Sequence, residues 1–222
     1  MKRAELIAAF RQMVDDETAR YLWSDAELRR YLDAAQREAA ERGRLLRDTT
    51  TAAVTQVAIV AGTAGYALDG RILDVERAKL RSQRLTLEIT STARMDRERP
   101  GWQAHSGAAR YLLVDAEGGG WRGTLAPIPT QADTLDLAVH RLPLGAMNTD
   151  DDAPEIPERY HLDLLEWMAH LAYQKRDTET YNESKSLEHG AAFTAVFGER
   201  IDANVQRKQA ERRPEAVVFR EF

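Results

Sequence analysis

The sequence contains no cysteine and no long apolar run, and each absence removes a class of protein. Without cysteine there is no disulfide framework, no thiolate nucleophile and no metal site built on sulfur. No apolar run approaches the ~20 residues that a membrane-spanning helix needs. The first residues mix charged and apolar side chains too closely for the apolar core of a signal peptide. These features predict a soluble protein that is not secreted.

The charge is small in total but unevenly distributed. The 222 residues carry a formal net charge of −5. Residues 71–110 hold nine Lys or Arg against five Asp or Glu, whereas residues 111–170 hold three against eleven. A protein that grips DNA by its phosphates is expected to be broadly basic. The distribution fits a subunit whose oppositely charged regions contact neighbouring copies, or two ordinary solvated faces.

Two helices are predicted over residues 1–49. Apolar side chains recur at helical spacing in the first segment and give one apolar stripe. The second helix has clearer boundaries, because Ser24 and Glu27 form a capping box and Gly43 supplies a stop. We therefore expect these residues to form the N-terminal helices of a helical bundle.

Near residue 50 the pattern changes from helical to strand-like. Threonine and β-branched residues dominate the next segment, and apolar and polar residues alternate in several later ones. Strands are expected in residues 49–60, 71–80, 84–90 and 134–143, a hairpin in 109–129 with a turn at Gly118–Gly120, and a turn or short helix in 91–102. Residues 50–145 therefore predict an inserted antiparallel β-sandwich or barrel-like domain.

After the strands the chain returns to helices. Residues 146–157 are rich in proline, glycine and aspartate without periodicity, which predicts a linker. Helices are expected over 158–176 and 178–197 within a C-terminal helical region of residues 158–211, and residues 212–222 remain as an extended tail. The expected fold class is α+β, a helical bundle with an inserted antiparallel β domain and an extended C-terminal tail.

The helix expected from residue 158 carries three polar residues on one face. Asp163, Glu166 and His170 follow one another at i, i+3 and i+7. Carboxylates beside an imidazole are typical ligands of a hard cation and typical acid–base groups. The HExxH spacing is absent, however, and no second cluster completes a metal site. A polar face toward solvent or a neighbouring subunit is the favoured interpretation, and no catalytic residue, metal or cofactor is expected.

The same helix is apolar around much of its circumference. A helix of this kind is buried from more than one direction. We therefore predict that Leu164, Trp167, Met168 and Leu171 pack within the bundle or against a second subunit.

Two other functions remain open. A cell-wall (peptidoglycan) hydrolase needs two carboxylates that flank a cleft, and Glu166 is one candidate, but the 36 acidic residues single out no pair. A DNA-contacting module could use Arg77, Lys79, Arg81 and Arg84, although no aromatic side chains are interleaved for base stacking.

Four stretches of the sequence resemble a known family. They are RMDRERPGWQAHSGAARYLLV, GTLAPIPTQADTLDLAVHRLP, PEIPERYHLDLLEWMAHLAYQKRDTE and AAFTAVFGERI. Their specific parts are the LxPxP run, the RLP strand end and the IPERYHxxLLxWMxxLAYxKxD helix. Together they resemble the head-to-tail adaptor (connector or neck) proteins of tailed bacteriophages, especially podovirus-type gatekeeper or tail tubular proteins. The resemblance covers the chain from about Trp23 to about Ile201.

This resemblance implies a structural protein without enzymatic activity or cofactor. Such adaptors form a homo-oligomeric ring, expected to be a dodecamer, that binds beneath the portal protein and extends the DNA channel toward the tail. The implied partners are the portal protein, a downstream tail or nozzle protein, and genomic DNA that passes without sequence-specific binding, with no membrane involved. The implied location is the neck of the virion, and the host cytoplasm during assembly.

In similar proteins a C-terminal segment reaches onto the portal. The resemblance therefore implies a portal-docking role for the tail of this chain. Its apolar anchors would be Val217, Val218, Phe219 and Phe222, and its charged partners Arg212, Arg213 and Arg220.

Overall fold

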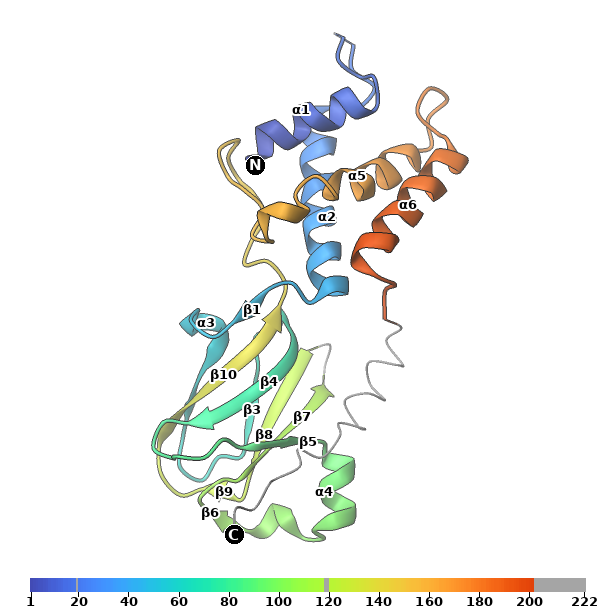
Figure 1. Cartoon of the computed structure of the whole chain (residues 1–222). Coiled ribbons are helices and arrows are strands. Elements are labelled where there is room, and N and C mark those ends of the chain that lie inside the picture. Colours follow the sequence, from blue (N-terminus) through green and yellow to red (C-terminus); the bar gives the residue numbers. More distant parts are fainter. Residues whose placement is uncertain (19, 118–119, 202–222) are drawn as a thin grey trace, which may run out of the picture. The chain divides into compact units, whose positions relative to one another are not determined.

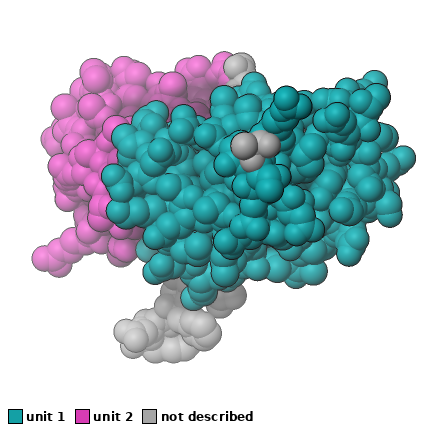
Figure 2. All heavy atoms as spheres, turned by 90° about the horizontal axis from the view of Figure 1, so that it is seen from above, with its two compact units in different colours: residues 1–47, 141–200 teal, residues 48–140, 201–222 magenta. Residues whose placement is uncertain are grey.

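The computed structural model describes residues 1–18, 20–117 and 120–201 of the chain. They form two compact units, which Figure 2 colours separately. The first unit contains residues 1–47 and 141–200, and the second is built on residues 48–140. Up to Arg200, the described chain leaves the first unit after Arg47 and returns to it at Arg141 (Figure 1). Helices and strands are both present, so the mixed α and β character expected from the sequence is confirmed.

The first unit is helical. Its helices are α1 (Arg3–Met13), α2 (Asp25–Gly43), α5 (Leu164–Tyr173) and α6 (Glu183–Phe197), with a 3₁₀ turn at Glu158–Tyr160. The helix expected from residue 158 begins at Leu164, after the 3₁₀ turn. The helix expected from residue 178 begins only at Glu183, because the Asn182 side-chain oxygen accepts a hydrogen bond from the Lys185 N–H (3.0 Å) and caps the helix there.

Trp23 lies in the core that these four helices share. Its side chain is fully buried, and its indole N–H donates to the Ala172 carbonyl oxygen at 3.1 Å. Its ring makes edge-on contacts with Phe10 and Tyr173, with centroid distances of 5.9 and 5.6 Å. Burial of such an aromatic side chain contributes roughly 3 kcal/mol to folding. The ring therefore joins α1, α2 and α5 through one side chain at the start of α2.

Residues 142–157 contain no helix or strand, but they pack against the helical unit. The Met147 side chain is buried in the core, and its backbone N–H donates to the Asp33 carboxylate of α2 at 3.0 Å. The buried Arg3 guanidinium of α1 donates to Asp150 at 2.7 Å and to the Met147 carbonyl oxygen. The segment predicted as a linker is thus held by both N-terminal helices.

The described strands form three sheets. They are β1 (Arg47–Asp48), β2 (Gln56–Ile59), β3 (Gly65–Ala67), β4 (Ile72–Leu80), β5 (Glu88–Thr90), β6 (Ser106–Gly107), β7 (Tyr111–Glu117), β8 (Gly120–Ala126), β9 (Ile128–Pro129) and β10 (Asp133–Arg141). One sheet has the order β1–β10–β2 with β4 also on β10, another has β3–β8–β7–β5, and β6 pairs with β9. The strands that the structure describes form no closed barrel, so the barrel-like alternative is wrong.

The two larger sheets share one apolar core. Val75 and Leu137 come from the first sheet, and Leu112 and Leu125 come from the second. All four side chains are almost fully buried. The alternation of apolar and polar residues in the sequence therefore reports which side of each sheet faces this core.

The sequence predicted antiparallel sheets, but two strand pairs in the structure are parallel. β5 pairs in parallel with β7, and β6 pairs in parallel with β9. A parallel pair needs a long crossover connection. Residues 91–110 provide it with α4 (Thr92–Glu98) and a 3₁₀ turn at Trp102–Ala104. The hairpin expected in 109–129 is confirmed, since β7 and β8 pair antiparallel with Tyr111 opposite Ala126.

The first expected strand is partly helical. Residues Ala52–Thr55 form the short helix α3, and β2 begins only at Gln56. The Asp48 carboxylate accepts hydrogen bonds from the backbone N–H groups of Thr50 (2.9 Å) and Thr51 (3.0 Å). An aspartate that bonds its own backbone in this way turns the chain. The β-branched residues of the segment predicted a strand there and gave no indication of the turn or of α3.

Candidate functional site

The predicted polar face of α5 lies against α6 of the same chain. Glu166 Oε2 is 2.7 Å from Nδ1 of His189 on α6. His170 Nδ1 is 2.8 Å from the carbonyl oxygen of Ser186, also on α6. The favoured interpretation, a face toward solvent or another subunit, is therefore wrong for Glu166 and His170. Both side chains connect α5 to α6 through polar contacts.

Both ring nitrogens of His170 have partners within the helical unit. A carbonyl oxygen can only accept, so Nδ1 carries the hydrogen and donates to Ser186. Nε2 then accepts from the side-chain amide of Gln174 at 3.0 Å. The ring also lies 4.5 Å from the Trp167 ring, centroid to centroid. With both ring nitrogens engaged inside the helical unit, His170 has no nitrogen left for a metal or a substrate.

Asp163 does not complete a catalytic pair with Glu166. Burial raises the pKa of the Asp163 carboxyl above its usual value, and the nearby Glu166 charge raises it further. Both carboxylates belong to the same end of one helix, and neither lines a cavity described below. Within residues 1–18, 20–117 and 120–201, no group of three or more His, Asp or Glu side chains is arranged to hold a metal ion.

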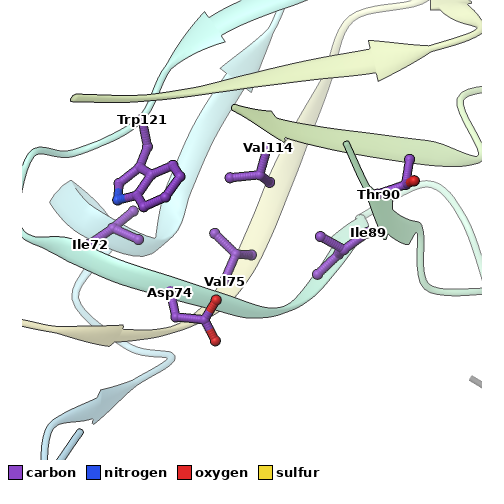
Figure 3. A pocket seen from close by; sticks show the side chains of 7 residues that line it. All are labelled: Ile72, Asp74, Val75, Ile89, Thr90, Val114 and Trp121. Atoms are coloured by element: carbon purple, nitrogen blue, oxygen red, sulfur yellow. The ribbon is translucent and has the colours of Figure 1, made fainter. Parts of the chain in front are cut away.

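A small cavity lies between the two larger sheets (Figure 3). Its volume is about 20 Å³, and its lining includes Ile72, Val75 and Trp121. One carboxylate, Asp74, lies at its edge, and the buried Thr90 hydroxyl has no hydrogen-bond partner among the described residues. A space of this size holds one water molecule and no substrate.

A larger cavity of about 390 Å³ lies in the second unit. Its lining comes from α4, the segment after it and strands β6 to β8, and includes Arg99, Trp102, His105, Arg110 and Tyr111. No carboxylate is among the described residues that line it. The paired carboxylates that a glycoside hydrolase needs are therefore not found in this cavity.

A family model described as SU10 adaptor protein matches residues 1–218. The chain belongs to the SU10 adaptor protein family. This is a family of phage head-to-tail adaptors, and the resemblance found in the sequence is thereby confirmed. No curated protein matches the sequence.

Membership of the SU10 adaptor protein family gives the chain a structural role in a bacteriophage. That role agrees with the expectation of a protein that is not an enzyme. It makes the chain a component of the virion neck, and it implies contact with portal and tail proteins. None of the described helices is long and apolar enough to cross a membrane.

The four residues of α5 that were predicted to pack in the bundle or against a second subunit are buried to different extents. Leu164 and Met168 are fully buried in the helical core. Trp167 is partly buried against that core, and the Arg42 guanidinium lies 4.7 Å from its ring centre. Leu171 is half-buried and is not part of the core cluster. A contact of these residues with a second subunit stays a prediction.

The predicted portal-docking residues lie outside the described residues. They are Arg212, Arg213, Val217, Val218, Phe219, Arg220 and Phe222. Their role in this SU10 adaptor family member therefore stays a prediction.

The basic residues considered for DNA contact are not all free. Arg81 binds Asp136 through two hydrogen bonds, Nε to Oδ2 at 2.8 Å and Nη2 to Oδ1 at 2.9 Å. A paired guanidinium offers less charge to a DNA phosphate. The positive charge of the residues proposed for DNA contact is thus partly neutralised by Asp136.

The larger cavity was not predicted as a site. The sequence drew attention to its surroundings only through the family resemblance, because the stretch beginning at Arg94 and the LxPxP run both contribute lining residues. The crossover that brings α4 next to β7 and β8 is a long-range feature, and local sequence patterns do not report it.

Proposed function

We propose that this protein is a ring-forming head-to-tail adaptor that binds below the portal, extends the DNA channel and provides the attachment site for the tail. The observation that carries the proposal is the match of the SU10 adaptor family over residues 1–218. We further propose that each subunit is a helical bundle with an inserted sandwich of two sheets. Four helices that share one core, and two sheets that share another, support this arrangement.

A closed ring needs two different surfaces on each subunit, because every subunit meets two neighbours head to tail. The helical unit exposes apolar side chains in several places along the chain, and two of these places are candidates for such surfaces. Leu187 on α6 is 65% exposed and Val196 is 45% exposed. Tyr21 and Leu22, after the end of α1, are 50% and 37% exposed. We propose that these side chains belong to the contacts between copies, since apolar side chains in water favour burial.

The DNA channel needs a surface that lets the genome slide. A net charge of −5 gives little reason for DNA to adhere, because phosphate binding depends on a surplus of basic side chains. Steeply salt-dependent binding of double-stranded DNA to the isolated protein would contradict this part of the proposal.

The tail, residues 212–222, is proposed to dock on the portal. The test compares the full chain with a chain that ends at residue 211, each mixed with purified portal and imaged by negative stain. We expect closed rings on the portal for the full chain only, and an unchanged circular dichroism spectrum for the shortened chain. Point variants separate the two kinds of contact: Phe219→Ala with Phe222→Ala removes apolar anchors, and Arg212→Ala with Arg213→Ala removes charges. Full portal binding by the shortened chain would overturn the docking role.

A further inference from the structure

The larger cavity of the second unit combines an apolar floor with a basic rim. Met95, Leu113 and Ala126 form a small buried cluster beneath it, and Trp102 and Tyr111 pack on that cluster. Met95 and Ala126 line the cavity together with Trp102 and Tyr111, so a ligand would meet apolar and aromatic surface there. Such a floor favours an apolar or aromatic group.

Two exposed arginines, Arg99 and Arg110, line this cavity, and neither forms an ion pair with a described residue. No carboxylate of the described residues lies within ion-pair distance of Arg99 or Arg110, although Arg99 lies 5.0 Å from the Tyr111 ring centre. The nearby acids have other partners. Asp96 accepts from the Trp102 indole N–H at 2.8 Å, and Glu98 accepts from Arg94 at 2.7 Å.

A third rim group has a free ring nitrogen. His105 Nδ1 lies 3.0 Å from the Gly101 carbonyl oxygen, so it carries the hydrogen and donates. Its Nε2 is left without a partner among the described residues. Arginine forks recognise carboxylates with paired hydrogen bonds. The chemistry of the cavity therefore fits a peptide with an aromatic side chain close to a carboxylate.

The chain itself contains such a peptide. Residues 215–222 read EAVVFREF and place Phe219 and Phe222 beside Glu221. The described chain ends at Ile201, and 21 residues follow it. Residues 202–214 connect Ile201 to this segment and span about 45 Å when extended, so the segment can reach a surface within that distance of Ile201.

We propose that residues 215–222 of this chain bind in the larger cavity, with a phenylalanine ring on the apolar floor and Glu221 at Arg99 and Arg110. Binding removes two phenylalanines and two valines from water before assembly. The proposal rests on the proposed function in one respect, because the same segment is the one expected to dock on the portal. The cavity would therefore hold the segment until the portal displaces it.

The absence of cysteine makes a direct test possible in the full chain. A disulfide requires Cα atoms within about 7 Å. Cysteines are introduced at Ala108, which is exposed and lines the cavity, and at Val218. We expect the Ala108→Cys, Val218→Cys chain to form a disulfide under mild oxidation. The matched control carries Leu85→Cys with Val218→Cys, because Leu85 is 80% exposed in the same unit but does not line the cavity.

Charge exchange then tests the proposed ion pair. In the Ala108→Cys, Val218→Cys background, Arg110→Glu is expected to slow disulfide formation about tenfold, because it replaces an attraction with a repulsion. Adding Glu221→Arg to that variant is expected to restore the rate. Arg97→Glu serves as the control, since Arg97 is exposed and does not line the cavity.

The outcomes separate the two proposals. A disulfide no faster than in the Leu85→Cys control, or a rate that Arg110→Glu leaves unchanged, overturns the cavity proposal whatever the portal does. A fast disulfide that portal protein abolishes supports both proposals. A fast, charge-dependent disulfide that forms equally in saturating portal supports the cavity proposal, and it overturns portal docking by this segment when the reduced Ala108→Cys, Val218→Cys chain still forms rings on the portal.

Discussion

Gly190 lies on α6 at the point where the His170 ring of α5 approaches. A Cβ added at Gly190 would lie 2.9 Å from His170 Nδ1, closer than real Cβ atoms approach other heavy atoms. The ring has little freedom to move, because Ser186 and Gln174 hold its two nitrogens. A glycine inside a helix normally costs about 1 kcal/mol relative to alanine. Here the missing side chain of Gly190 allows α6 to lie close to His170 of α5.

Gly190→Ala should therefore destabilise the protein despite its better helix propensity. We expect the free energy of unfolding to fall by about 1–2 kcal/mol, since overpacking outweighs the propensity gain. Urea denaturation followed by circular dichroism measures the change. In a His170→Ala background the clash is absent, so the same substitution should stabilise by about 1 kcal/mol. Stabilisation in the native background would show that the ring moves freely and contradict this account.

Thr90 supplies a second test at the residue scale. Its buried hydroxyl has no hydrogen-bond partner among the described residues (Figure 3). An unsatisfied buried polar group costs about 1–3 kcal/mol. Thr90→Val keeps the shape without the hydroxyl, so we expect thermal denaturation to show a gain of about 1 kcal/mol. Thr90→Ser, which keeps the hydroxyl and loses a methyl group, should destabilise. A loss of stability in Thr90→Val would mean that water in the adjacent cavity satisfies the hydroxyl.

At the scale of elements, the sequence predicts the presence of most helices and strands but not all of their limits. The start of α2 was predictable because Ser24 and Glu27 lie three residues apart, and the reciprocal cap is present in the structure. The start of α6 was missed because Asn182 lies inside an apparently continuous helical pattern. The parallel pairing of β5 with β7 was missed because pairing partners are set by tertiary packing.

The cap of α2 predicts a loss of stability at acid pH. Hydrogen bonds from the backbone and side chain of Ser24, followed by contacts with Lys175, lower the pKa of Glu27 to about 2. A carboxyl whose folded pKa lies below its unfolded value stabilises the fold above the unfolded pKa, here 4.5, and this contribution is lost as the pH falls toward 2.

Glu27→Gln should flatten the dependence of stability on pH between 4.5 and 2. Because Glu27 is partly exposed to solvent, we expect the loss at pH 7 to be only about 1 kcal/mol. Lys175→Met is the matched variant, since it removes the ion pair at 3.0 Å and keeps the hydrogen bonds to Ser24. It should retain most of the pH dependence. An unchanged pH profile in Glu27→Gln would contradict the assignment.

At the scale of the whole molecule, the sequence predicted the family and the mixed fold, but it did not predict the larger cavity. The face with Asp163, Glu166 and His170 attracted attention because these residues are close in sequence. In the structure Glu166 and His170 bind α6. The larger cavity combines Arg99 with Ala126 and other residues that only a crossover connection brings together. Local spacing reports neither the helix partner nor the crossover.

Assembly is tested through the exposed apolar residues of the helical unit. Leu187 is 65% exposed on α6, so Leu187→Glu changes a surface and leaves the buried core intact. Because glutamate is a good helix former, we expect the free energy of unfolding of the isolated chain to change by less than about 0.5 kcal/mol. A charge in a ring contact must be desolvated, so closed rings on the portal should become rare in negative-stain images. Leu85→Glu, at a position 80% exposed in the second unit, is the control and should assemble normally. If Leu187→Glu forms rings as readily as the native chain, α6 does not contribute this residue to the contact, and the surface after α1 becomes the one to alter.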